Sequence, residues 1–193
     1  YLKEMEVIKM CKKNAYITTY SKIHFTPCCP NPEDINIQDI AHSLSLLCRG
    51  NGHYKTFHPV AQPSINCCNE AKARGLSNKI QLGCLLHDAT EAYLSDITRP
   101  VKQFLKKYIE MENTLFASIL QKFHMLPMTQ QEYNAIFEID DHILYFEFLH
   151  FMGEKINIKN PYLKSNPDFL QKSFEEAEHC FLQLYDALFN ESL

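Results

Sequence analysis

Residues 84–96 read CLLHDATEAYLSD and bring together four side chains that can bind a metal or move protons. His87 and Asp88 are adjacent, Glu91 follows His87 by four residues, and Asp96 comes shortly after. On a helix His87 and Asp88 project about 100° apart, so they can share a cation only if other segments supply further ligands. Glu91 falls on the same helical face as His87. The stretch therefore predicts half of a metal or acid–base site.

Apolar residues on both sides of this stretch recur at spacings of three and four, which indicates helices. Helices are expected over 37–50, closed by Gly50; from a cap at Ser77 to His87 and Asp88; from about Pro100 to Phe123; from Gln130 to Met152; and onward from a cap at Asn166 with Pro167 in first position. Buried stripes are expected at Val101, Phe104, Tyr108, Leu115, Ile119 and Phe123, and at Leu170, Phe174, Ala177, Phe181, Leu184 and Leu188. Only Tyr16 to Phe25 alternates enough for a short extended segment. The pattern predicts a compact all-α bundle.

Length and composition limit the class of protein. A chain of 193 residues with 46% hydrophobic residues suits one domain, which we expect over residues 16–193 after an N-terminal arm of residues 1–15. A net charge of −4 without a basic stretch argues against binding to nucleic-acid polymers. No apolar run approaches the roughly 18 residues of a membrane span, and residues 1–14 lack a signal-peptide core, so a cytoplasmic protein without a membrane partner is expected.

The eight cysteines do not form a recognisable disulfide or zinc pattern. Cys28 with Cys29 and Cys67 with Cys68 are vicinal pairs, and no CxxC occurs. In a chain long enough for an apolar core, such cysteines are typically free, buried thiols. We therefore expect thiols that pack as small hydrophobic side chains.

The motif HDATEAYLSDITRPVK, residues 87–102, resembles the central motif of HD-domain metal-dependent phosphohydrolases, in the branch of bacterial 5′-deoxynucleotidases and small phage or bacterial nucleotide hydrolases. Residues 19–62 resemble the N-terminal segment of that family, and FEIDDHILYFE, residues 137–147, resembles the helix that brings the last carboxylate ligand. The similarity covers roughly residues 16–152. It implies an HD-domain helical bundle, a divalent cation such as Mn, Co or Mg, a nucleotide substrate and a homodimer.

The same resemblance implies the ligands of that cation. His87 and Asp88 match metal ligands, and the later helix supplies another carboxylate. Matching I-D-x6-E of residues 139–147 to the A-D-x6-E of the family places this ligand at Asp140, with Asp141 as the alternative. Imidazole and carboxylate ligands suit a cation that activates water and clamps a phosphoryl group.

Two carboxylates and three candidate substrate-binding residues complete the implied site. Glu91 matches the acid–base group of the family and Asp96 the residue that assists the water, although Asp96 could instead cap the turn before Pro100. Candidates for substrate binding are Arg49, His53 and Lys102. Arg49 matches an arginine beside the substrate phosphate, where its planar fork suits bidentate binding; the alternative is a charge that ends a helix. Glu112 intrudes on an apolar row, and pairing with a neighbouring cation is its simpler explanation.

Pro63 departs from the pattern, because this chain reads VAQPS where the family has a segment resembling VAQHS. Proline offers no lone pair, so the implied set of two His and two Asp lacks one ligand. Either the cation binds weakly with water in the gap, or catalysis is lost, or the substitution is engineered; His53 and His58 are the nearest replacements in sequence. Proline also suits only the first turn of a helix, so we expect Pro63 to shift the local start of the segment after Val60.

Two functions follow from these observations. The first is hydrolysis of phosphate esters of (deoxy)nucleotides, releasing phosphate from a monophosphate or triphosphate from a dNTP. The second is a non-catalytic HD-fold protein that binds a nucleotide or a protein partner, which the proline at position 63 favours.

Overall fold

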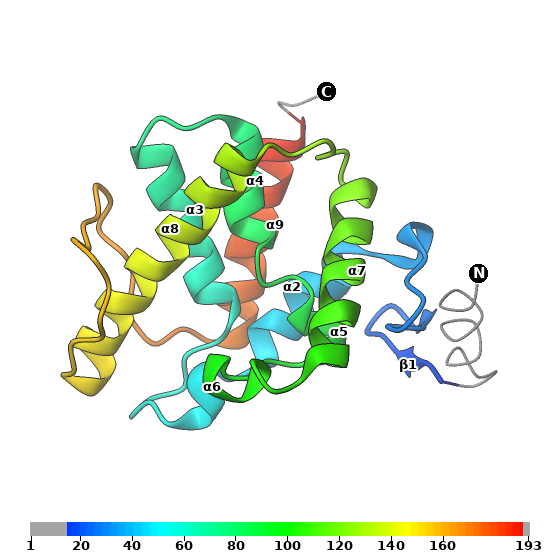
Figure 1. Cartoon of the computed structure of the whole chain (residues 1–193), viewed down its shortest axis with the longest axis horizontal. Helices are drawn as coiled ribbons and strands as arrows, with labels where there is room; N and C mark the ends of the chain where they lie inside the picture. Colours follow the sequence, from blue (N-terminus) through cyan, green and yellow to red (C-terminus); the bar gives the residue numbers. More distant parts are fainter. Residues whose placement is uncertain (1–14, 191–193) are drawn as a thin grey trace.

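A computed structural model of the chain describes residues 15–190 and confirms the all-α class (Figure 1). The helices are α2 (Ile37–Leu46), α3 (Ala61–Ala73), α4 (Asn78–Leu86), α5 (Glu91–Leu94), α6 (Arg99–Lys102), α7 (Lys106–Lys122), α8 (Gln130–Glu147) and α9 (Phe174–Asn190). Short 3-10 turns η1 (Pro32–Asp34) and η2 (Arg49–Gly52) and a π-helical turn η3 (Phe148–Met152) join them. The predicted extended segment is a hairpin of β1 (Ile17–Thr18) and β2 (His24–Phe25), with Ile17 opposite Phe25. The predicted arm, up to residue 14, lies outside the described residues.

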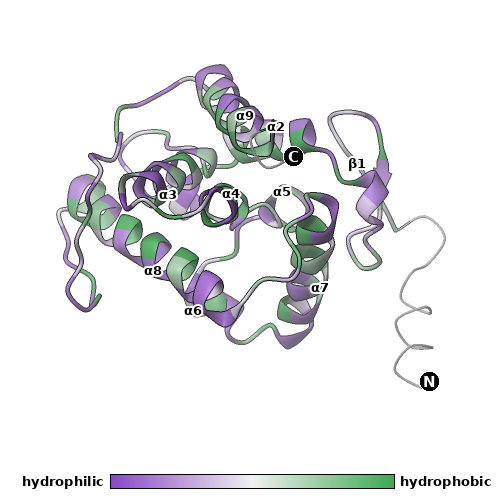
Figure 2. Ribbon diagram, turned by 90° about the horizontal axis from the view of Figure 1, so that it is seen from above, coloured by the Kyte–Doolittle hydropathy of each residue, from purple (hydrophilic) through white to green (hydrophobic). Residues whose placement is uncertain are grey.

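Helix α4 occupies the centre of the bundle. Seen from above, it lies between α9 and α8 (Figure 2), and it packs most closely on α3. Every residue from Gln81 to Leu86 is buried. Gly83 permits the close approach of α8, because any side chain there would collide with Ile136. The C-terminal end of α4, and with it His87, is therefore fixed inside the molecule.

Polar caps recognisable in the sequence fix several helix starts. The Ser77 side chain accepts a hydrogen bond from the backbone N–H of Ile80 and begins α4 as predicted. Thr129 and Glu132 form a reciprocal capping box at the start of α8. These caps fix the residues at which α4 and α8 begin.

The helix expected to end at Gly50 ends at Leu46 instead. The chain leaves the helix to pair with residues 58–60, where the Arg49 N–H donates to the His58 carbonyl (2.8 Å) and the Val60 N–H to the Leu47 carbonyl (3.0 Å). These long-range hydrogen bonds outweigh one more helical turn. They also turn Arg49 towards the interior.

The helix expected from Pro100 to Phe123 is broken into α6 and α7. Val101 and Phe104, predicted to be buried, are 52% and 80% exposed, so the apolar stripe begins only at Leu115. At the break Lys102 Nζ lies 2.7 Å from Glu112 Oε1, which confirms the predicted pairing of Glu112. At this break the chain therefore forms an ion pair in place of the apolar contacts predicted for Val101 and Phe104.

The last helix begins at Phe174 and not at Asn166. Ser173 and Glu176 exchange hydrogen bonds at its start, whereas the Asp168 backbone is tied to Asn66 on α3 through both its N–H (3.1 Å) and its carbonyl (3.0 Å). Those bonds hold the preceding segment extended, and Leu170 is 75% exposed rather than buried. Within α9 the predicted stripe is buried at Ala177, Phe181 and Leu188.

Free thiols are confirmed at Cys28, Cys48, Cys67, Cys68, Cys84 and Cys180. The prediction is wrong for Cys29, which is disulfide-bonded. Among residues 15–190, none of the helices combines the length and the hydrophobicity that a membrane span requires.

Candidate metal centre

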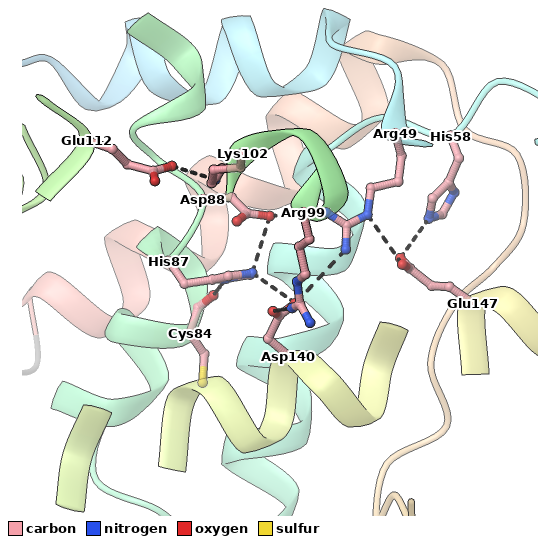
Figure 3. Close-up of polar contacts among 10 residues, drawn as sticks. All are labelled: Arg49, His58, Cys84, His87, Asp88, Arg99, Lys102, Glu112, Asp140 and Glu147. Atoms are coloured by element: carbon pink, nitrogen blue, oxygen red, sulfur yellow. Dashed lines mark hydrogen bonds and ion pairs between the residues drawn. The ribbon is translucent and has the colours of Figure 1, made fainter. Parts of the chain in front are cut away.

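The predicted ligands His87, Asp88 and Asp140 converge (Figure 3). His87 Nε2, at the end of α4, lies 3.2 Å from Asp88 Oδ2 and 3.3 Å from Asp140 Oδ1 on α8. Asp141 instead points outward to Arg99 and is 40% exposed. Of the two carboxylates weighed from the sequence, Asp140 is therefore the one that faces the histidine.

The orientation of His87 directs one ring nitrogen at the two carboxylates, where it could bind a cation. Nδ1 donates to the Cys84 carbonyl oxygen (2.7 Å), which places the proton on Nδ1 and directs Nε2 at the carboxylates. Among residues 15–190, neither His87 Nε2 nor Asp140 Oδ1 has a partner in hydrogen-bonding geometry, although both are buried. Buried polar atoms are rarely left unpaired. These two fit a metal ion.

Without a metal, His87 and the two aspartates Asp88 and Asp140 stabilise one another in their charged forms. Burial acts to lower the pKa of His87, but Asp88 and Asp140 raise it well above its usual value. Burial acts to raise the pKa of both aspartates, and His87 and Arg49 hold them below their usual range. A cation entering this centre would displace a proton from the imidazole.

A third side chain, Cys67 on α3, joins the group. One ligand atom from each of Cys67, His87 and Asp140 lies within 4.8 Å of the other two, and all three ligand residues belong to a buried cluster that could hold a metal ion. The sequence analysis took Cys67 only for a buried thiol. Its position one helical turn after Pro63 is the signal that could have identified it.

Pro63 is buried in the first turn of α3 and offers no ligand atom. The helix starts at Ala61, directly after Val60, which places Pro63 in its first turn. His53 and His58 do not fill the gap: His53 is exposed, and His58 Nε2 lies 3.5 Å from Glu147 Oε1. The expectation that either histidine reaches the metal centre is wrong, because β-pairing of residues 48 and 59 directs His58 to Glu147.

Arg49 joins this centre to Glu147, a residue that the sequence analysis did not assign to the site. Its Nε lies 3.3 Å from Glu147 Oε2 and its Nη1 3.4 Å from Asp88 Oδ2, so it is not a charge ending a helix. Burial acts to lower the pKa of Arg49, but Glu147, Asp88 and Asp140 raise it well above its usual value. The guanidinium is therefore a fixed positive charge beside the predicted ligands.

A pocket of about 350 Å³ opens beside the centre. Its wall has acidic residues Asp88, Glu91, Asp96 and Asp140, cationic residues Arg49, Arg99 and Lys102, and apolar or aromatic residues Tyr54, Leu144, Phe148 and Ile156. His53, predicted to bind substrate, does not line it. Positive φ angles at Gly50 (60°), Asn51 (52°) and Gly52 (76°) turn the chain so that Tyr54 lies inside and His53 outside.

Glu91 and Asp96 both face this pocket, as predicted. Burial, followed by Asp88 and Asp96, raises the pKa of Glu91 to about 9, and Glu91 Oε2 has no hydrogen-bond partner in the described part of the chain. Burial also raises the pKa of Asp96. Helix α6 begins after Thr98, so Asp96 is not its capping residue. Glu91 is thus protonated at neutral pH and can donate a proton.

Arg99 is a residue of the site that the sequence analysis missed. It contacts Asp140 Oδ2 (Figure 3) and Asp141 Oδ1, both at 2.7 Å, and 60% of its side chain is exposed. Nothing in the local pattern distinguishes this arginine from Lys102, because its role depends on α6 lying against α8. The pocket therefore carries one buried cation, Arg49, and two at its rim.

Comparisons with known proteins give relatives without an assigned activity. No family model matches the chain. It is 39% identical over 114 residues to the uncharacterized protein YfdR of Escherichia coli (strain K12), a match covering 59% of this chain and 61% of YfdR. It is 38% identical over 100 residues to the uncharacterized protein RCAP_rcc00048 of Rhodobacter capsulatus, covering 49% of this chain and 50% of that protein. The chain therefore spans between half and two thirds of the curated relatives it matches.

Proposed function

We propose that this protein is a divalent-metal-dependent phosphohydrolase that acts on nucleotides. The observation that carries the proposal is the pair of buried ligand atoms, His87 Nε2 and Asp140 Oδ1, which face each other at 3.3 Å next to Asp88 without meeting hydrogen-bonding geometry. These atoms border a pocket that also holds protonatable carboxylates and cations. A phosphoryl-transfer site requires these three kinds of group together.

His87, Asp88 and Asp140 would hold the cation. When bound, a divalent ion of this kind polarises phosphoryl oxygens and lowers the pKa of a water molecule. Arg49, fixed by Glu147 and Asp88, would bind one face of the phosphate through its planar fork of donors. Lys102 would add a point charge from the rim.

The two carboxylates of the pocket would divide the proton transfers. In the metal-free protein the pKa of Glu91 is raised to about 9, so Glu91 is protonated at neutral pH and would donate to the departing oxygen. Asp96 lies in a less enclosed part of the pocket wall and would accept the proton of the attacking water. Such a separation of two carboxylates by environment is how one site supplies both an acid and a base.

The rest of the pocket supports a nucleotide rather than inorganic phosphate. Tyr54 and Phe148 offer aromatic surface in the pocket wall, and Ile156 adds an apolar side chain. A volume of about 350 Å³ lies within the range of small-ligand sites. We keep both leaving groups in the proposal, phosphate from a monophosphate and triphosphate from a dNTP.

The test is a screen of ribo- and deoxynucleoside mono- and triphosphates with Mn²⁺, Co²⁺ and Mg²⁺, following phosphate and triphosphate release. Metal-dependent release that is lost in Asp140→Asn supports the proposal. A protein that binds metal, as shown by its metal content, but hydrolyses none of these nucleotides contradicts it.

A second candidate is a nucleotide- or protein-binding relative of such enzymes that has lost catalysis. Two observations favour it: Pro63 stands where a ligand is expected, and Arg99 neutralises Asp140 at 2.7 Å. Calorimetry of nucleotide binding separates the two functions. Tight, metal-independent binding without product formation would favour the second.

A further inference from the structure

Helix α3 faces the metal centre with a sulfur atom where the resemblance leads one to expect an imidazole. We infer that Cys67 is a metal ligand that replaces the one missing at position 63, and that the centre therefore prefers Zn²⁺ or Co²⁺ to Mg²⁺. The inference deepens the proposed function by naming its metal, and it rests on that function only for the location of the centre.

The helical register places Cys67 on the correct face. Residues four apart on a helix lie one above the other, so Cys67 follows Pro63 on the side of α3 that faces α4 and α8. Both residues are buried. The ligand atoms of Cys67, His87 and Asp140 lie within 4.8 Å of one another, so a small contraction around a cation would bring all three into its shell.

The composition of the set determines which metal it favours. Sulfur, imidazole and carboxylate ligands suit Zn²⁺ and Co²⁺, which accept such mixed donors in a tetrahedral shell. Mg²⁺ takes oxygen ligands in an octahedron and retains several waters, which a buried thiol cannot match. On binding, the S–H bond breaks as the sulfur–metal bond forms, and the proton leaves to the buffer.

The neighbouring Cys68 provides a matched control. It is buried on the same helix but projects about 100° away from Cys67. The ligand group contains Cys67 and not Cys68. A serine at either position removes one buried sulfur, so a general effect on packing should appear in both variants.

The experiment is a titration of Co²⁺ into the chelator-treated full chain, followed by near-ultraviolet absorption. Wild type and Cys68→Ser should show the charge-transfer band of a thiolate–Co²⁺ bond, whereas Cys67→Ser should lack it and bind Co²⁺ roughly 10-fold or more weakly. Circular dichroism checks that both variants are folded. An unchanged band in folded Cys67→Ser would overturn the inference.

Restoring the imidazole gives a second, independent readout. In the double variant Pro63→His/Cys67→Ser, Co²⁺ binding should recover without the charge-transfer band, because the new ligand is nitrogen. Recovery of the band, or no recovery of binding, would contradict the inference that Cys67 supplies the ligand missing at position 63.

The outcomes distinguish this inference from the proposed function. A band in wild type together with no hydrolysis of any nucleotide would leave Cys67 as a ligand and remove the phosphohydrolase. Hydrolysis that is fastest with Mg²⁺ and unaffected by Cys67→Ser would leave the enzyme and remove the thiolate ligand.

Discussion

Helix α3 buries charged or metal-binding groups at two places, and only one of them is saturated with hydrogen-bond donors. Glu70, near the end of the helix, is fully buried and accepts bonds from Arg74 Nε (2.7 Å), the Ser165 N–H (2.7 Å) and the Ser165 hydroxyl (2.6 Å). One turn earlier, Cys67 faces His87 Nε2 and Asp140 Oδ1, which have no hydrogen-bond partner in the described part of the chain. The first cluster is complete as a structural element; in the second, His87 and Asp140 are held together by charge alone.

The pKa values of two buried glutamates express the same contrast. Burial acts to raise the pKa of Glu70, but hydrogen bonds from Ser165 and Arg74 hold it below its usual value, so the ionised form stabilises the fold. Burial and the neighbouring aspartates raise the pKa of Glu91 to about 9, so its ionised form destabilises the fold. A destabilising group retained beside a pocket is typical of a functional site.

The largest expected effect on stability is that of Glu70→Gln. The amide would place a donor against the Lys164 and Ser165 N–H groups, which now donate to the carboxylate at 2.7 to 3.0 Å. We expect a loss of roughly 3 kcal/mol in the free energy of unfolding, measured by urea titration. The control Glu138→Gln removes an ion pair to the same Arg74 at a position 55% exposed and should cost less than about 0.5 kcal/mol. Equal losses in the two variants would refute the contrast.

Glu91→Gln should lower turnover without destabilising the fold. Loss of a general acid typically lowers the rate roughly 10² to 10⁴-fold, so we expect at least a 10²-fold fall in turnover with nucleotide binding retained. Glu110→Gln, an exposed position on α7, is the matched control. Turnover unchanged in Glu91→Gln would remove Glu91 from the mechanism and direct attention to Asp96.

The two glutamates should also give opposite pH profiles in chelator-treated protein. The folded pKa of Glu70 is lowered from 4.5, so its stabilisation is complete above that pH and is lost as pH falls through the folded pKa. The folded pKa of Glu91 is raised from 4.5 to about 9, so its cost grows as pH rises between these values. Urea titrations across both windows should show Glu70→Gln approaching wild type in acid, and Glu91→Gln gaining on wild type towards alkaline pH. Parallel profiles would mean that the environments of the two carboxylates do not differ as described.

Local sequence signals predicted much of the fold and part of the centre. The cap at Ser77 is encoded within a few residues, and the structure keeps it. The expectation that His87 and Glu91 share one helical face is wrong, because α4 ends at Leu86 and α5 begins at Glu91. Matching residues 139–147 selected Asp140 over Asp141, and Asp140 is the residue that meets His87. Such signals succeed where one helix determines both the register and the direction of a side chain.

The parts that could not be predicted depend on contacts distant in sequence. Arg99 acquires its role from α8, which lies about forty residues away in the chain, and Cys67 acquires its role from α4 and α8 together. The extended segment before α9 is held by Asn66, whose hydrogen bonds to Asp168 outweigh the helix-start signal of Asn166 and Pro167. Intrinsic helix signals are weak enough for a few tertiary hydrogen bonds to override them.

The smallest expected effect belongs to Asp141→Asn, and it tests the register of the centre. Asp141 is 40% exposed and contacts Arg99 at the rim, so its loss should change stability by less than about 0.5 kcal/mol and leave metal binding intact. The same substitution at Asp140 removes a carboxylate that is 3.3 Å from His87 Nε2 and should lower metal affinity roughly 10-fold or more. Both variants lose one ion pair with Arg99, so a difference between them in metal affinity cannot come from that ion pair. Metal titration of the two proteins decides between them: a greater loss in Asp141→Asn would mean that the helix presents its other carboxylate to the cation.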